Sequence, residues 1–229
     1  MNHIIVTGAS GNLGQAVIKK FLRENYHVTG TLIPNDPIAV DSQGKHFETA
    51  VVDLRQEEAT AQFIDRMIEK YQKIDVVVLT VGGFAMGNML NTSSADIFNQ
   101  YKLNFETAYH VARPVFAQMM KQGSGRIFLI GSRPGADMKN SKGMVAYSLT
   151  KSLIFRLAEL MNEEAKGTEI MTSVIVPSTI DTPQNRASMP DADFSKWQTP
   201  EAIAEVIYWH CTEEGAMLRE EVIKVYGGV

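Results

Sequence analysis

A tyrosine and a lysine stand four residues apart in the segment Tyr147-Ser148-Leu149-Thr150-Lys151. In a helix this spacing places the two side chains on one face. A nearby ammonium group favours the phenolate and lowers the pKa of a tyrosine, which suits a general acid or base at neutral pH. The spacing therefore predicts that Tyr147 transfers a proton and that Lys151 lowers its pKa. A chance match is the alternative, and only the position of the pair among the other elements favours the catalytic interpretation.

Two polar residues that precede this pair could complete a catalytic site. Ser132 ends the apolar run RIFLIGS, where its hydroxyl could hydrogen-bond a substrate oxygen. An ordinary turn residue before a proline is the alternative. Asn104 lies inside the helical segment NQYKLNF although asparagine is a mediocre helix former, which favours a role beyond helix formation. A polar residue on the surface is the alternative there.

Residues 7–14, with the sequence TGASGNLG, follow an apolar strand and precede a helix, and we call them the glycine turn. This context favours a dinucleotide-binding turn over an ordinary strand-to-helix connection. Gly8 would permit the tight turn, Gly11 would let N–H groups approach a pyrophosphate, and Gly14 would let the helix pack closely. The expected contacts are Gly8, Ser10, Gly11, Asn12, Leu13 and Gly14.

The residues that choose between NAD and NADP are not obvious. An acidic residue often follows the second strand and binds the adenosine ribose of NAD, but Leu32 occupies that place. No basic residue of the glycine turn or the strand end could hold the 2′-phosphate of NADP. Asp36 could reach the ribose from the next loop, or it could be an exposed turn residue. We expect NAD(P)H, with NADP weakly favoured over NAD because Leu32 cannot repel a 2′-phosphate. Asp53, after the third strand, is placed to contact the adenine ring.

The elements that must position these residues alternate along the chain. Short β-branched runs begin at Ile4, His27, Phe47, Asp75, Arg126, Met171 and Glu221. Segments with a helical period lie between them, at 12–25, 56–72, 94–121, 145–166 and 199–212. This alternation predicts a single α/β domain over residues 1–229, with a doubly wound parallel sheet and right-handed crossovers. The crossover between the second and third strands is short, contains two prolines and lacks an apolar helical face, so no helix is expected there.

The composition bounds the function. At 229 residues, with 45% apolar and 21% charged residues, the chain suits one ordinary globular domain. The net charge of -4, without a basic cluster, argues against nucleic acid as a partner. The apolar runs are too short to span a membrane, and the first residues do not resemble a signal peptide. Cys211 is the only cysteine, which favours a cytoplasmic protein. The five histidines show no ligand spacing, so no metal is expected.

The glycine turn, Asn104, Ser132 and the Tyr147–Lys151 pair resemble, in this order, the short-chain dehydrogenase/reductase family over nearly the whole chain. The resemblance implies a Rossmann-like fold and an NAD(P)H-dependent oxidoreductase that acts on a small-molecule substrate. Tyr147 would exchange the substrate proton, Lys151 would lower the tyrosine pKa and bind the nicotinamide ribose, Ser132 would hold the carbonyl, and Asn104 would anchor a water relay. Further expected cofactor contacts are Leu32, Asp53, Leu54, Val81, Gly82, Tyr147, Lys151, Pro177, Ile180 and Thr182. A homodimer or homotetramer, paired through the helices at 94–121 and 145–166, is also implied.

Several segments depart from the family pattern. The segment Thr80-Val81-Gly82-Gly83 stands where the family usually has Asn-Asn-Ala-Gly, Asn12 replaces a glycine of the turn, and Ser178 replaces a glycine after Pro177. The segments VGGFAMGN, GMVAYSLTK and DTPQNRASMPDADFSKW look like those of quinonoid dihydropteridine reductases. Those reductases carry an acid after the second strand and lack the Asn–Ser pair, and this chain reverses both features. Dihydropteridine reduction is therefore one alternative function, and a non-catalytic NAD(P)-binding regulator is another.

The loops after the strands, at 82–92, 132–144 and 177–198, would form the binding crevice, because carboxyl-end loops do so in open α/β sheets. Residues 178–198 would form the substrate side of it. Methionine and aromatic side chains on these loops predict an apolar wall suited to a flat ring, although each could instead pack into the core. The candidates are Phe84, Met86, Met144, Met189, Phe194 and Trp197.

Overall fold

One sheet of seven parallel strands organises the molecule, in the order β3-β2-β1-β4-β5-β6-β7. The computed structural model describes residues 1–36 and 46–227; the expectation that no helix joins the second and third strands falls on 37–45, outside these ranges. The strands are β1 (His3–Thr7), β2 (His27–Leu32), β3 (Phe47–Val51), β4 (Val76–Leu79), β5 (Ser124–Ile130), β6 (Glu169–Pro177) and β7 (Val222–Val225). Runs of buried β-branched residues such as Val76–Leu79 form these strands because helices cover both faces of the sheet.

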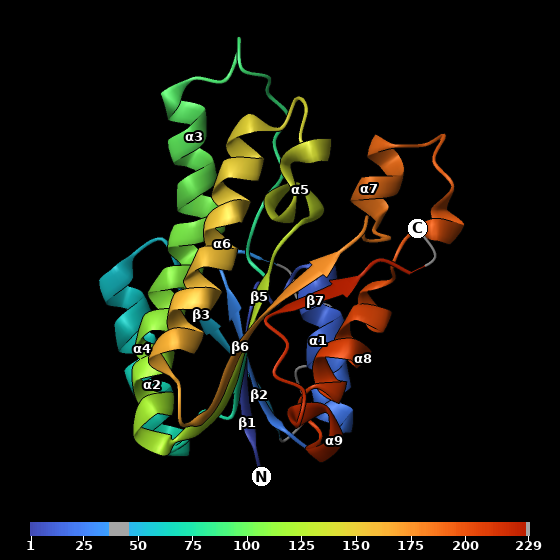
Figure 1. Cartoon of the computed structure of the whole chain (residues 1–229). Coiled ribbons are helices and arrows are strands. Elements are labelled where there is room, and N and C mark those ends of the chain that lie inside the picture. Colours follow the sequence, from blue (N-terminus) through green and yellow to red (C-terminus); the bar gives the residue numbers. More distant parts are fainter. Residues whose placement is uncertain (37–45, 228–229) are drawn as a thin grey trace.

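Helices cover the two faces in two layers (Figure 1). Helices α1 (Asn12–Arg23) and α8 (Pro200–Trp209) pack together on one face. The other face carries α2 (Glu57–Tyr71), α4 (Thr107–Gln122) and α6 (Val145–Glu164). Phe63, Val111 and Ile154 are fully or almost fully buried there, and burying each such side chain contributes about 1.5–3 kcal/mol. The remaining segments are α3 (Ser94–Tyr101), the π-helical segment η1 (Lys102–Glu106), α5 (Arg133–Ala136), η2 (Met138–Asn140), α7 (Pro183–Ser188), η3 (Phe194–Lys196) and α9 (Glu213–Ala216).

The predicted doubly wound parallel sheet is confirmed, and each predicted strand and long helix is found near its predicted position. The helix predicted over 94–121 consists of α3, η1 and α4 in succession. The short helices α5, α7 and α9 were not predicted. Each of them begins after a capping residue, Ser132, Thr182 and Thr212 respectively, whose side chain accepts a hydrogen bond from an N–H of the first turn.

The strand order reverses beside β1, whose neighbours are β2 and β4. Open α/β sheets bind ligands at the carboxyl ends of the strands next to such a reversal. Here the chain after β4 is tied to the end of β1: the Thr80 N–H donates to Thr7 Oγ1 at 3.0 Å, and the Thr80 hydroxyl donates to the Thr7 carbonyl at 2.6 Å. These bonds place the loop after β4 against the glycine turn.

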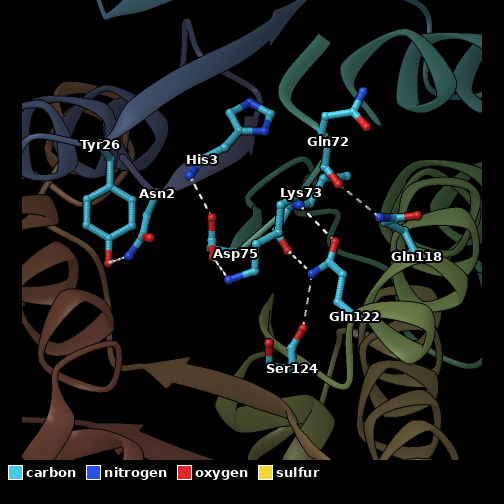
Figure 2. Close-up of polar contacts among 10 residues, drawn as sticks. Asn2, His3, Tyr26, Gln72, Lys73, Asp75, Gln118, Gln122 and Ser124 are labelled. Atoms are coloured by element: carbon cyan, nitrogen blue, oxygen red, sulfur yellow. Dashed lines mark hydrogen bonds and ion pairs between the residues drawn. The ribbon is translucent and has the colours of Figure 1, made fainter. Parts of the chain in front are cut away.

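At the amino ends of the strands, opposite the carboxyl ends, polar side chains join neighbouring strands (Figure 2). Asp75 Oδ2 accepts a hydrogen bond from the His3 N–H at 2.9 Å. The Gln122 side chain accepts from the Ile74 N–H at 3.0 Å and donates to the Ile74 carbonyl at 2.9 Å. It also donates to the Ser124 carbonyl at 3.2 Å, so the starts of β1, β4 and β5 are held in register. Among the described residues, no helix has both the length and the apolar character needed to cross a membrane.

Candidate functional site

Asn104 clamps the loop after β4 to the π-helical segment η1. Its side chain is 1% exposed. Its Oδ1 accepts from the Gly83 N–H at 2.9 Å, and its Nδ2 donates to the Gly83 carbonyl at 3.0 Å and to Gln100 Oε1 at 2.8 Å. The sequence predicted Asn104 inside a regular helix, whereas it lies in a π-helical turn; such turns are frequent at functional sites. Asn104 therefore positions the β4 loop through three hydrogen bonds.

Lys151 points from α6 toward the same loop. The side chain is 5% exposed, and its Nζ donates to the Ile130 carbonyl at the end of β5, at 2.8 Å. A Cβ atom added at Gly82 would lie 3.2 Å from this Nζ and 2.7 Å from Asn104 Oδ1, so both side chains converge on Gly82. Burial lowers the pKa of Lys151 to about 8, because removal from water disfavours the ammonium form.

Tyr147 lies one helical turn before Lys151 and next to Ser132. Burial raises the pKa of the Tyr147 phenol, and a hydrogen bond with the Ser132 side chain acts in the opposite direction. The predicted lowering of this pKa by Lys151 is therefore wrong for the protein alone, since burial dominates and the lysine binds the Ile130 carbonyl. Ser132 Oγ accepts from the Gly135 N–H at 3.1 Å, so its hydroxyl proton is the one that can be donated, toward Tyr147 or toward a bound molecule.

A pocket of about 440 Å³ opens beside these residues, and we call it the glycine-turn pocket. A Cβ at Gly14 would lie 2.2 Å from the Gly8 carbonyl oxygen, so the start of α1 packs onto the turn at a distance that only glycine allows. Most of the predicted cofactor contacts line this pocket: Gly8, Ser10, Gly11, Asn12, Leu13, Gly14, Leu32, Asp53, Leu54, Val81, Gly82, Ile180 and Thr182. Three others, Tyr147, Lys151 and Pro177, are not among its lining residues.

Two charged residues line this pocket that the sequence did not clearly predict: Asp36 was one of two alternatives, and Arg55 was not predicted. Asp36 borders the pocket, and its Oδ2 accepts a hydrogen bond from the Ser10 hydroxyl at 2.7 Å. Arg55 also lines it and donates to both carboxylate oxygens of Asp53 at 2.9 Å, which lowers the pKa of Asp53. The position of Arg55, two residues after Asp53, was a signal for this pair, whereas the Ser10–Asp36 contact joins residues 26 positions apart.

The predicted apolar wall divides into two groups. Phe84 is 59% exposed, and its ring centre lies 5.0 Å from that of Tyr147 in an edge-on arrangement. Met86 and Met144 belong to this group, because Gly87 forms a β-bridge with Met144 and Met86 is the residue before Gly87. The second group contains Phe194 and Trp197, whose ring centres are 4.8 Å apart; Met189, in the same loop, is 40% exposed. Phe84 is thus the predicted wall residue with a direct contact to Tyr147.

Among residues 1–36 and 46–227, no three His, Cys, Asp or Glu side chains are grouped closely enough to hold a metal ion. The polar groups that converge at the carboxyl end of the sheet are therefore an amide, a hydroxyl, a phenol and an ammonium. These groups can hold and protonate an oxygen or nitrogen atom of a bound molecule.

Known proteins with this sequence pattern and fold identify the family. The pattern described as short chain dehydrogenase matches residues 2–193. Dihydropteridine reductase of Dictyostelium discoideum is 28% identical over 97% of this chain and 93% of its own length. Acetoacetyl-CoA reductase of Acinetobacter sp. (strain RA3849) is 25% identical over 98% of this chain and 96% of its own. The solved structure "ElxO with NADP Bound" has the same fold, with a TM-score of 0.89 and 21% identity over 99% of this chain and 98% of that one. The chain therefore belongs to the short-chain dehydrogenase/reductase family and is an oxidoreductase.

Proposed function

We propose that this protein transfers a hydride from a nicotinamide dinucleotide to a small carbonyl or quinonoid substrate, with Tyr147 as the proton donor. The observation that carries the proposal is the convergence of Asn104 and Lys151 on Gly82, a lining residue of the glycine-turn pocket, with Ser132 and Tyr147 in contact nearby. The family membership and the intact set of four polar residues weigh against a non-catalytic regulator.

The protonation state of Tyr147 supports the reductive direction. Because burial raises the pKa of this phenol, it carries its proton at neutral pH, which is the form that a proton donor needs. Ser132 would hold the substrate oxygen with its hydroxyl proton, and Lys151 would bind the nicotinamide ribose. The edge-on ring of Phe84 would cover the face of the substrate next to Tyr147.

The residues present fit a dinucleotide. The glycine turn presents N–H groups at the start of α1, where a helix favours a pyrophosphate. The pocket volume of about 440 Å³ lies within the range of about 300–1,000 Å³ that small-molecule sites occupy. The bound dinucleotide would supply the hydride, while the protein supplies its orientation and the proton.

We also propose that NADH is the preferred cofactor, which reverses the weak preference for NADP expected from Leu32 alone. No acidic residue directly follows β2, where Leu32 stands, but Asp36 places a carboxylate at the edge of the pocket. A carboxylate there accepts hydrogen bonds from ribose hydroxyls and repels a 2′-phosphate. The cation that lines this pocket and could hold such a phosphate, Arg55, is already paired with Asp53.

The cofactor proposal is tested by binding and by kinetics. Titration with NADH should raise Tm, and at a concentration of about 100 Kd the stabilisation should be about 2.7 kcal/mol. No shift with millimolar NADH or NADPH would contradict dinucleotide binding. Wild type should show a kcat/KM at least about tenfold higher with NADH, and Asp36→Ala should bring the two values close together by improving the use of NADPH. A preference for NADPH in wild type would overturn the role given to Asp36.

A second candidate function, quinonoid dihydropteridine reduction, rests on the matching of this chain along nearly its whole length to the Dictyostelium discoideum dihydropteridine reductase. The exposed ring of Phe84 beside Tyr147 also suits a flat substrate. A panel containing a quinonoid dihydropterin and simple ketones and aldehydes separates the two candidates. Turnover of the pterin alone would favour the second.

We further propose that the protein forms a homodimer or homotetramer through α6 and the neighbouring α3 and α4. Leu149, Leu153 and Leu160 are 46%, 36% and 63% exposed, and their spacing places them on one face of α6. Phe98 on α3 is 61% exposed as well. Such an apolar face is typical of a surface that is covered by a partner. A cytoplasmic location stays a prediction that rests on the single cysteine, and cell fractionation tests it.

A further inference from the structure

Arg133 is a cation beside the proposed catalytic serine. It follows Ser132 directly, and its guanidinium lies 4.8 Å from the centre of the Tyr226 ring. Among the residues described, no carboxylate lies within 4.0 Å of this guanidinium. Arg186, on α7, is different, because it donates to both oxygens of Asp181 at 2.5 and 2.7 Å. The charge of Arg133 is therefore available to a ligand, and the face of the tyrosine ring attracts the guanidinium.

Arg133 borders a hollow of about 360 Å³, which we call the Arg133 hollow. Its lining residues are Arg133, Ser178, Thr179, Asp193, Lys196 and Trp197. The hollow adjoins the glycine-turn pocket along one short stretch of chain: Ser178 and Thr179 line the hollow, and Ile180 and Thr182 line the pocket. A substrate held at Ser132 thus has a second space within reach, on the side of the segment that follows β6.

The hollow carries a net positive charge. It contains two cations, Arg133 and Lys196, and one carboxylate, Asp193. Asp193 Oδ1 is occupied by the Ser195 hydroxyl and N–H, at 2.6 and 3.2 Å. The other oxygen, Oδ2, lies 3.8 Å from Lys196 Nζ, and both side chains are more than half exposed, so this pair is weak. The charge of Arg133 remains uncompensated.

We propose that the Arg133 hollow binds an anionic group, a carboxylate or a phosphate, carried by the carbonyl substrate; this inference rests on the proposed function. The planar guanidinium matches the oxygens of either anion through paired hydrogen bonds. The Trp197 ring, tilted against that of Phe194, supplies an apolar wall for the carbon atoms between the anion and the reacting carbonyl. A neutral substrate of the same size leaves the guanidinium without this partner and binds more weakly.

Lys224 provides a matched control. Arg133 also borders a second hollow, of about 490 Å³, that contains Lys224 and Tyr226 but no residue of the segment 178–198. Lys224 has no carboxylate within 4.0 Å in the described part of the chain. A general attraction of anions to this side of the molecule would depend on both cations, whereas binding in the Arg133 hollow depends on Arg133.

The test compares 4-carboxybenzaldehyde with its methyl ester, methyl 4-formylbenzoate, as substrates of wild type, Arg133→Gln, Arg133→Lys and Lys224→Gln. Wild type should have a kcat/KM at least about tenfold higher for the acid. Arg133→Gln should remove this preference through a higher KM for the acid, with the ester unaffected. Arg133→Lys should keep part of the preference, and Lys224→Gln should keep all of it. A third aldehyde, 4-formylphenyl phosphate, shows whether carboxylate or phosphate is favoured.

Equal kcat/KM values for acid and ester in wild type would overturn the proposal. So would an equal loss for both substrates in Arg133→Gln, which indicates a structural role, or loss of the preference in Lys224→Gln. If no aldehyde is reduced with either nicotinamide cofactor, the carbonyl part of the proposed function fails. Calorimetric titration of the cofactor-bound protein with the acid and the ester then tests anion binding in the Arg133 hollow separately. Tighter binding of the acid that Arg133→Gln removes supports it, and equal Kd values contradict it.

Discussion

At the scale of single residues, Lys151 shows a conflict between stability and function. Its ammonium is buried, and among the described residues its one hydrogen-bond partner is the Ile130 carbonyl. Burial lowers its pKa from 10.5 to about 8, a shift of about 2.5 that corresponds to about 3 kcal/mol. Between pH 8 and 10.5 the unfolded chain binds more protons than the folded protein, so the free energy of unfolding rises with pH in this range. The buried charge therefore lowers the free energy of unfolding by its full amount below pH 8, and this loss disappears as the pH rises to 10.5.

Lys151→Met should therefore increase the free energy of unfolding at pH 7 by about 2–3 kcal/mol, after the lost hydrogen bond is subtracted, while it abolishes turnover. The gain should shrink when the same urea denaturation is repeated at pH 10. Lys102→Met, on the exposed side of η1, is the control and should change stability little at either pH. A Lys151→Met protein that is less stable than wild type at pH 7 would contradict this account of the lysine.

At the scale of elements, the succession α3–η1–α4 has the greatest consequence for the site, because its π-helical segment carries Asn104. Asn104→Ala should lower the free energy of unfolding by about 2–4 kcal/mol, since it leaves the N–H and carbonyl of Gly83 without partners. Gln100→Ala removes one bond of the same side chain and should cost about 1 kcal/mol. Urea denaturation of the two variants measures the difference, and equal losses would mean that the Gly83 contacts do not hold the loop.

The sequence predicts regular elements better than irregular ones, for a physical reason. The strands and long helices are visible because apolar residues recur with the period of each element. The π-helical segment around Asn104 leaves no such period, since it depends on contacts with the β4 loop. The same reason applies to α5 and α7, which consist of four and six residues and have capping residues but no apolar stripe. Their position depends on the loops around them.

At the scale of the whole molecule, the gathering of most motif residues around one pocket was predictable from the sequence, whereas contacts between distant segments were not. The glycine turn, Asp53 and Gly82 share one pocket, as expected from strands whose carboxyl ends meet. The Asp36 contact with Ser10 and the Lys151 contact with Ile130 join segments that only the folded chain brings together. The first contact supports the proposed preference for NADH, and the second directs Lys151 to β5, while burial raises the pKa of Tyr147.

Self-association through α6 is a second expectation at this scale. The double variant Leu153→Glu/Leu160→Glu places charges on the exposed apolar face and should convert the oligomer into a monomer, as measured by sedimentation equilibrium. Trp209→Glu is the control, because Trp209 is 44% exposed but lies on α8, which covers the other face of the sheet. A wild-type protein that is monomeric at micromolar concentration would contradict this expectation.

The proton-donor role of Tyr147 is tested most directly by the turnover of Tyr147→Phe on a ketone or aldehyde substrate, together with the cofactor Kd. Loss of the phenol should reduce kcat by about 10²–10⁴, because it removes a positioned acid, and should leave the cofactor Kd nearly unchanged. A quinonoid dihydropterin can take its proton from solvent, so its reduction should fall less in the same variant. Undiminished ketone or aldehyde turnover by Tyr147→Phe would contradict the proposed mechanism.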